Sequence, residues 1–174
     1  MNRTVAILTA LAVAGSLFAM TALPRAISSD SDDSDSDDSD SDDVLFEIEN
    51  FVGVSGPFLG ATNAIRGVNG AGAAWVLDEI EAEVMADGTF TVEVEGLVLT
   101  STGTNPIANF RAILSCLVSS GATVTTSNMM TGLFPATPEE DALIQATLTL
   151  PAICVAPIVF VTSPGGAWFA ASGF

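Results

Sequence analysis

The clearest pattern along this chain is an alternation of apolar and acidic positions on either side of an Ala-Asp-Gly turn. The apolar positions are Ile80, Ala82 and Val84 before the turn, then Phe90, Val92 and Val94 after it. The positions between them are mostly glutamate: Glu79, Glu81, Glu83, Glu93 and Glu95. Alternation with period two around an Asp-Gly pair predicts a β-hairpin with one buried side and one solvent-facing side.

The same alternation predicts the register of this hairpin. Paired residues share a face, so a two-residue loop at Asp87-Gly88, which would set Val84 opposite Thr91, is disfavoured. We therefore predict a three-residue loop closed by Gly88 in the left-handed region, with Val84 opposite Phe90. Two glutamate pairs then lie directly opposite each other: Glu79 with Glu95, and Glu81 with Glu93. Opposed like charges are destabilising, so this face should be solvated, or neutralised by a cation or an arginine.

Further strands are predicted by alternation or short apolar runs at 44–52, 110–118, 144–150, 158–161 and 167–171. Apolar residues on both sides of 110–118 indicate a strand buried on both faces. Residues 53–72 are glycine-rich and indicate a long loop or an irregular edge. Thr137-Pro138-Glu139-Glu140 has the form of a capping box and predicts at most one or two helical turns. Residues 44–174 are therefore expected to be all-β: an Ig-like β-sandwich of about seven to nine antiparallel strands.

Two segments precede this domain. Residues 1–27 combine a positive start at Arg3 with an uncharged apolar run, which is typical of an export signal. The run is also long enough to cross a bilayer, so a cleaved signal peptide and an uncleaved membrane anchor both stay open. Residues 28–43 contain only serine and aspartate and should form a disordered stalk. We expect an extracellular or cell-surface protein that meets a membrane only through its N-terminal segment, if that is uncleaved.

The charge balance excludes one class of partner. The chain has 21 acids against four arginines, with no lysine and no histidine. After Asp43, only Arg66 and Arg111 face twelve acids, a formal charge of −10. Such a domain repels phosphate backbones, which argues against nucleic-acid binding. Cations, basic surfaces or neutral polymers are the plausible partners, here an unknown extracellular protein or polymer. We expect Arg111 to be structural, offsetting nearby carboxylates.

The chain has two cysteines, Cys116 and Cys154. In an exported protein an even count predicts a disulfide, with two buried free thiols as the alternative. No Cys-x-x-Cys redox motif is present.

The absence of histidine, lysine and tyrosine excludes most kinds of catalytic site. Without histidine there is no Ser-His-Asp or Cys-His site and no histidine-based zinc site. We therefore expect no enzyme and no resident cofactor: the leading hypothesis is a non-catalytic structural or interaction module. One alternative is a calcium-dependent binding domain using Glu79, Glu81, Glu93 and Glu95, or the acids at 139–141. The other is a small carboxylate glycosidase using Glu81 and Glu93. The binding partner and the oligomeric state stay open.

Several short pieces of the C-terminal two-thirds resemble uncharacterised secreted proteins of actinobacterial-type genomes. The pieces are Ala74-Trp75-Val76-Leu77, Ala86-Asp87-Gly88, Val94-Glu95-Gly96-Leu97-Val98, Arg111-Ala112, Ser115-Cys116, Thr137-Pro138-Glu139-Glu140-Asp141-Ala142, Leu150-Pro151 through Cys154 to Ala156-Pro157-Ile158-Val159, and Ala171-Ser172-Gly173-Phe174. The resemblance implies a secreted β-domain and brings no activity, cofactor or catalytic residue. The Ser/Asp segment is not part of it; in composition that segment resembles the Ser-Asp stalks of Gram-positive surface adhesins.

Overall fold

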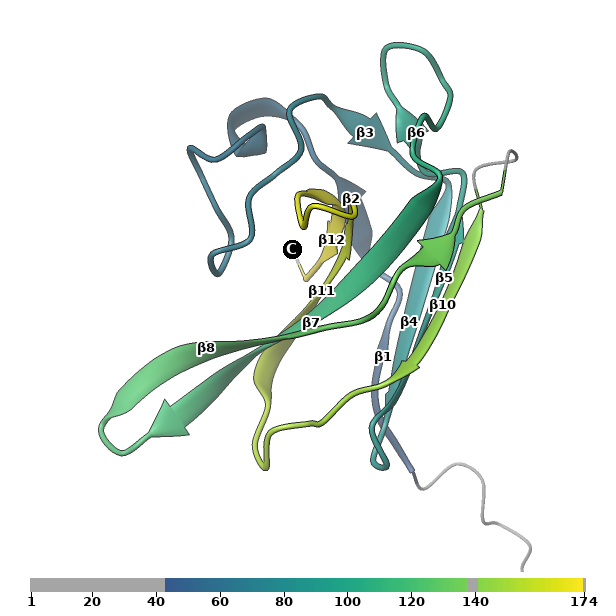
Figure 1. Cartoon of the computed structure of the whole chain (residues 1–174). Coiled ribbons are helices and arrows are strands. Elements are labelled where there is room, and N and C mark those ends of the chain that lie inside the picture. The colour runs from purple at the N-terminus through teal and green to yellow at the C-terminus, as the bar shows by residue number, and fades with distance from the viewer. Residues whose placement is uncertain (1–42, 138–140, 174) are drawn as a thin grey trace, which may run out of the picture. The chain divides into compact units, whose positions relative to one another are not determined.

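Strands account for every regular element of the described chain except one 3-10 turn, Gly56–Phe58 (Figure 1). The computed structural model describes residues 43–137 and 141–173. The expectations for residues 1–27, for the Ser/Asp segment ahead of Asp43 and for positions 138–140 therefore lie outside the described residues. Within them, no helix is long and apolar enough to cross a membrane.

The first sheet has four antiparallel strands in the order β1-β4-β5-β10. They are β1 (Val44–Ile48), β4 (Glu79–Met85), β5 (Thr89–Glu95) and β10 (Ala142–Thr147). The predicted hairpin is confirmed as β4-β5, with Val84 opposite Phe90 and three residues in the loop. Gly88 closes this loop with a φ of 90°, and its N–H donates to the Met85 carbonyl at 3.0 Å.

The second sheet has six strands, of which β2-β12-β11-β7-β8 form a continuous path and β9 pairs separately with β7. They are β2 (Phe51–Gly53), β12 (Trp168–Ser172), β11 (Val155–Thr162), β7 (Asn109–Ser120), β8 (Thr123–Met130) and β9 (Phe134–Pro135). A two-stranded sheet joins β3 (Trp75–Val76) to β6 (Val98–Leu99). The fold is all-β and antiparallel, and neither of the two larger sheets closes into a barrel.

Both larger sheets contribute to one hydrophobic core. Val84, Phe90 and Val92 come from the four-stranded sheet, while Leu114 and Val161 come from the six-stranded sheet; all five are fully buried. Their burial follows directly from the period-two alternation, because every second side chain of a strand projects to the same face.

Strand β7 is buried on both faces at its centre, as predicted. Leu114 and its neighbour Ile113 point to opposite faces, yet both are almost completely buried. The outer face is covered by the long segment between β2 and β3, which confirms the predicted loop at 53–72 (Figure 1). Arg66 from that segment donates to the Ser115 carbonyl at 2.8 Å and the Ala156 carbonyl at 2.6 Å. The segment is thereby fixed onto the sheet.

Several expectations need correction. The predicted strand 44–52 is two strands, because the chain leaves the four-stranded sheet after Ile48 and joins the six-stranded sheet at Phe51. Strand β8 was not predicted, because it is polar and lacks apolar alternation. Of the twelve described strands, nine have three or more residues, and three two-residue strands raise the total above the expected number. The capping box lies largely outside the described residues, and β10 begins at Ala142, just after it.

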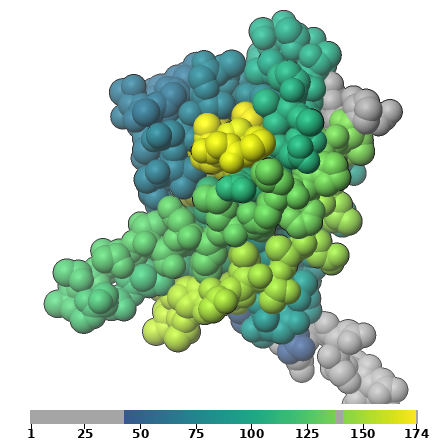
Figure 2. Space-filling model, viewed as in Figure 1, coloured from purple at the N-terminus to yellow at the C-terminus, as the bar shows by residue number. Residues whose placement is uncertain are grey.

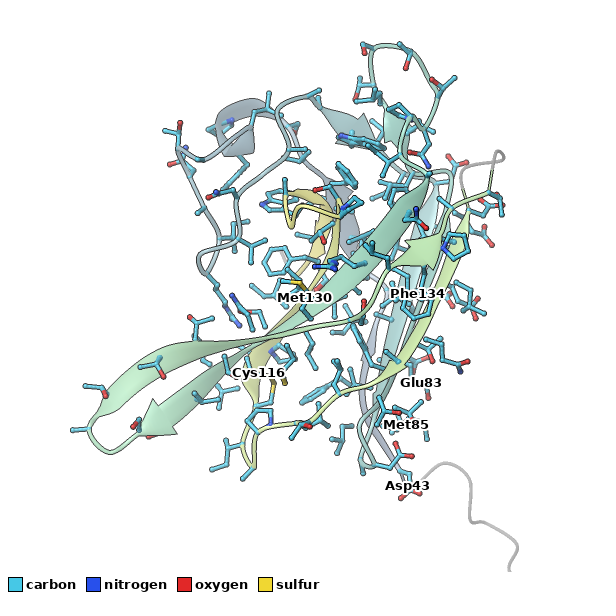
Figure 3. All side chains as sticks on the ribbon, in the orientation of Figure 1. Asp43, Glu83, Met85, Cys116, Met130 and Phe134 are labelled. Carbon is cyan, nitrogen blue, oxygen red and sulfur yellow. A yellow bond between two sulfur atoms is a disulfide. The ribbon has the colours of Figure 1, made fainter. Side chains whose placement is uncertain are left out.

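The predicted disulfide is confirmed. Cys116 on β7 and Cys154, just ahead of β11, are bonded, with a Cα–Cα distance of 4.9 Å (Figure 3). The bond links β7 to the segment that returns from the four-stranded sheet.

Replacing Gly88 by alanine should destabilise the protein. A Cβ here would meet the Leu148 carbonyl oxygen, and the positive φ is unfavourable for a side chain. We expect a loss of about 2 kcal/mol or more, measured by denaturant unfolding. Gly72→Ala is the control, because open space surrounds that position; it should change stability by less than about 0.5 kcal/mol. Equal effects of the two changes would contradict this explanation.

Removing the disulfide with Cys116→Ala and Cys154→Ala should also lower stability. The bond closes a separation of 38 residues. In the chain-entropy model such a loop contributes roughly 4 kcal/mol. Unfolding curves of the native chain under reducing conditions should show a similar loss. A loss below about 1 kcal/mol in both experiments would show that the bond contributes little.

Candidate functional site: an acidic sheet face

The outward face of the four-stranded sheet is lined with glutamates. Because Ile80, Ala82 and Val84 point into the core, the odd-numbered residues of β4 point to solvent. Seven glutamates line two adjoining shallow depressions on this side: Glu47, Glu49, Glu79, Glu81, Glu83, Glu93 and Glu95. We call this surface the acidic face. Figure 3 shows one of its members, Glu83, pointing away from the six-stranded sheet.

Six of these glutamates are paired directly across neighbouring strands. The pairs are Glu47 with Glu83, Glu81 with Glu93, and Glu79 with Glu95. The last two confirm the register predicted from the sequence. Glu81 and Glu93 are shared by both depressions and therefore lie at the centre of the acidic face.

No basic side chain shares this face, because both arginines of the described chain are engaged on the six-stranded sheet. Arg66 binds carbonyl groups there, and Arg111 lies on β7, where its Nη1 donates to the Met130 sulfur at 2.7 Å. The Arg111 Nε is buried without a partner in the described residues. The expectation that Arg111 offsets carboxylates is not supported, because its described partner is a thioether.

The electrostatic effect of this crowding is visible at Glu81. The pKa of Glu81 is raised, first by desolvation and then by repulsion from neighbouring carboxylates, namely Glu79, Glu49, Glu93 and Glu47. Every charged neighbour acting on Glu81 is thus another member of the acidic face. The protonated form of Glu81 is favoured because it carries no charge that must be desolvated or that neighbouring carboxylates repel.

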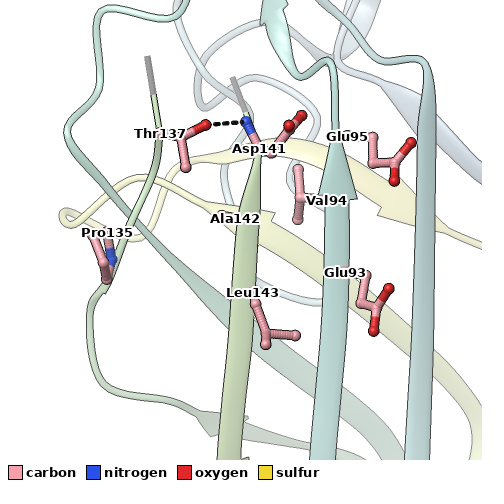
Figure 4. Close-up of a pocket in the computed structure, with 8 residues that line it drawn as sticks. All are labelled: Glu93, Val94, Glu95, Pro135, Thr137, Asp141, Ala142 and Leu143. Carbon is pink, nitrogen blue, oxygen red and sulfur yellow. Dashed lines mark hydrogen bonds between the residues drawn. The ribbon is translucent and has the colours of Figure 1, made fainter. Parts of the chain in front are cut away.

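At the β10 edge, the acidic face meets a hollow of about 380 Å³ (Figure 4). The carboxylates of Glu93 and Glu95 project to the same side of β5, and Asp141 lies at the start of the neighbouring β10. The Asp141 N–H donates to the Thr137 hydroxyl at 3.2 Å, and its Oδ1 accepts from the Gly96 N–H at 3.3 Å. The half-exposed Leu143 adds an apolar contact surface beside the acids.

The structure gathers the four predicted calcium ligands, Glu79, Glu81, Glu93 and Glu95, around one depression. In the part of the chain that is described, no group of three or more histidine, cysteine or acidic side chains is arranged to hold a metal ion. Calcium binding at these residues therefore stays a prediction. Of the acids at 139–141, only Asp141 lies within the described residues.

Sequence reasoning identified the hairpin glutamates but did not join Glu47 and Glu49 to them. Their alternation in the first strand was visible, and it indicated an exposed side. What the sequence did not show was the partner of that strand. Pairing of β1 with β4 places Glu47 beside the hairpin and extends the acidic face across a third strand.

Glu81→Gln should stabilise the protein at neutral pH and flatten its dependence on pH. Because the folded-state pKa lies above the ordinary value of 4.5, the folded protein holds this proton longer than the unfolded chain. Stability should therefore fall as pH rises from about 4.5 through the raised pKa. Unfolding curves between pH 4 and pH 7 would measure both effects.

Asp43→Asn is the control, because Asp43 lies outside the acidic face. Below this pH range Asp87 interferes with the opposite sign: its pKa is lowered by a backbone hydrogen bond from Thr89, and that stability is lost in acid. A Glu81→Gln variant no more stable than the native chain at pH 7 would contradict the repulsion.

Comparison with known proteins gives no assignment: no family model, no curated protein and no solved structure matches this chain. The resemblance to secreted actinobacterial-type proteins stays a prediction.

Proposed function

We propose that this chain is an exported, released or surface-tethered, non-catalytic interaction module that binds a basic partner surface through its acidic face. The observation that carries the proposal is the set of directly opposed glutamate pairs with no arginine among them. Opposed like charges cost stability, and a sequence keeps such local conflicts mainly where function requires them. A cationic partner would relieve the repulsion on binding.

Solubility alone is a weaker explanation of this surface. Net charge keeps a protein soluble wherever the charges lie, and it does not need them in register across a sheet. Here seven of the ten acids that follow Asp43 within the described residues share one sheet face. The exposed Leu143 and Leu45 supply apolar contact area at the outer strands of the same sheet.

A binding role also agrees with the rest of the domain better than catalysis does. The two tryptophans, Trp75 and Trp168, are 3% and 1% exposed, so neither offers a platform for a sugar ring. The disulfide suits an oxidising compartment outside the cytoplasm. For the fold, we propose an Ig-like β-sandwich, in which one sheet presents its outer face to a partner.

Binding to immobilised polylysine would test the proposal. The measurement uses a background chain in which the aspartates of residues 28–42 are replaced by asparagine, so that the Ser/Asp segment does not bind. In this background Glu79→Gln, Glu81→Gln and Glu93→Gln together should weaken binding by about tenfold or more, because three adjacent charges are lost. Raising the salt concentration should reduce the difference.

The matched control removes three charges that do not line the depressions of the acidic face, with Asp43→Asn, Asp78→Asn and Asp87→Asn. It should weaken binding by less than about threefold, because only the general attraction falls. Equal losses from the two triple variants would show that net charge, not the acidic face, governs binding. A calcium-induced rise in melting temperature that Glu81→Gln and Glu93→Gln abolish would instead favour the calcium-dependent alternative.

A further inference from the structure

Strand β8 ends the six-stranded sheet and leaves one side of its backbone without a strand partner in the described chain. The loop before it is Gly121-Ala122, with Gly121 at a φ of 65°, and Ser120 opposite Thr123 closes the hairpin. Such a closing pair exchanges hydrogen bonds. At the far end of β8, the Thr131 N–H donates to the Ala112 carbonyl at 3.0 Å. Thr131, like Thr123, is an odd-numbered residue that is hydrogen-bonded to β7.

Both ends of β8 therefore indicate the same alternation of backbone hydrogen bonds along the strand. Residues of odd number direct their N–H and C=O groups to β7. Residues of even number direct theirs away from the sheet. The outward set is Val124, Thr126, Asn128 and Met130.

Strand β8 lacks the features that normally protect a sheet edge. It is eight residues long, and its register with β7 is unbroken from Thr123 to Met130. It contains no proline, no charge and no bulge. Among the other edge strands of the larger sheets, β1 has an irregularity between Val44 and Phe46 and carries Glu47, and β2 has only three residues. Strand β10 is also uncharged and regular, but it is shorter than β8, with six residues.

The charge distribution indicates what this edge can pair with. No charged residue lies between Arg111 and Glu139, whereas the chain from residue 44 onward carries a formal charge of −10. Two copies of this protein repel each other wherever their acidic surfaces approach. The β7-β8 hairpin projects away from the four-stranded sheet (Figures 1 and 2), so contact at its edge keeps the two acidic faces apart.

We propose that β8 pairs antiparallel with β8 of a second copy of this chain, about a two-fold axis at Ser127. This register sets Val124 opposite the partner's Met130 and Thr126 opposite the partner's Asn128. All four are outward residues, so the two strands can exchange about eight backbone hydrogen bonds.

The side chains fit this register as well as the backbone does. Val124 is 69% exposed and Met130 is 47% exposed, and both lie on the same face of the hairpin. Pairing places Val124 of each copy against Met130 of the other copy. The two-fold axis makes two such contacts, and each covers exposed apolar area. The result is an isologous interface that joins two six-stranded sheets edge to edge.

Sedimentation velocity of the full chain, with its disulfide intact, tests the proposal. An interface of one strand pair is small, so the dimer should dissociate on dilution, but dimer should predominate at about 100 µM. Higher salt should favour it, because screening weakens the repulsion between the acidic domains. A native chain that stays monomeric at that concentration overturns the proposal.

Two variants of Thr126 locate the interface. Thr126→Pro removes an outward N–H that the β7-β8 ladder does not use, so the fold should survive while dimer is lost. Thr126→Lys sets two positive charges near the axis and should raise the dissociation constant at least about tenfold. Thr102→Lys, on the exposed turn after β6, makes the same charge change away from β8 and should leave the dimer intact.

Comparison of Thr126→Lys with Thr102→Lys separates strand pairing from general charge effects. Each lysine lowers the negative charge by the same amount, so association through any other surface would strengthen in both. An unchanged dimer in Thr126→Lys, or equal weakening in Thr102→Lys, overturns the assignment to β8. Melting temperature and non-reducing electrophoresis check that each variant keeps its fold and its disulfide. A monomer whose β8 amides become protected from hydrogen exchange only on adding a different extended polypeptide would assign the edge to another partner.

Discussion

Burial of β7 on both faces is the constraint on which the rest of the domain depends. Its inner face packs against the four-stranded sheet, and its outer face is covered by the segment between β2 and β3. It also carries Cys116 and pairs with β8, β9 and β11. A strand with so many neighbours fixes the position of both layers, because close packing leaves no room to shift one without the others.

Charge is segregated between the two sheets. Glutamates occupy the outer face of the four-stranded sheet, whereas both arginines of the described chain bind groups of the six-stranded sheet. The arginines therefore serve the fold, and they leave the acidic face uncompensated. The hairpin β7-β8 adds a third kind of surface, which is uncharged along its whole edge strand. An acidic face and a neutral edge on different sheets suit two different kinds of contact.

The limits of sequence reasoning are clearest at β8 and in the first strand. Strand β8 has the sequence Thr-Val-Thr-Thr-Ser-Asn-Met-Met, and no face of it is apolar, because it extends beyond the core. Alternation reports burial, so a strand held mainly by backbone pairing with β7 gives no such signal. Residues 44–52 show the opposite case: the alternation was read correctly, but it did not reveal that the chain changes sheets between Ile48 and Phe51.

The sequence by itself determined the all-β class, the register of the β4-β5 hairpin, the exposed side of its glutamates and the cysteine pairing. Each of these follows from local alternation, turn chemistry or the presence of just two cysteines. Only the tertiary structure decided that β1 brings Glu47 and Glu49 to the hairpin, that both arginines lie on the other sheet, and that β8 forms an uncharged edge. Strand order depends on contacts between residues far apart in the chain, and the free energy of those contacts is not encoded in any single segment.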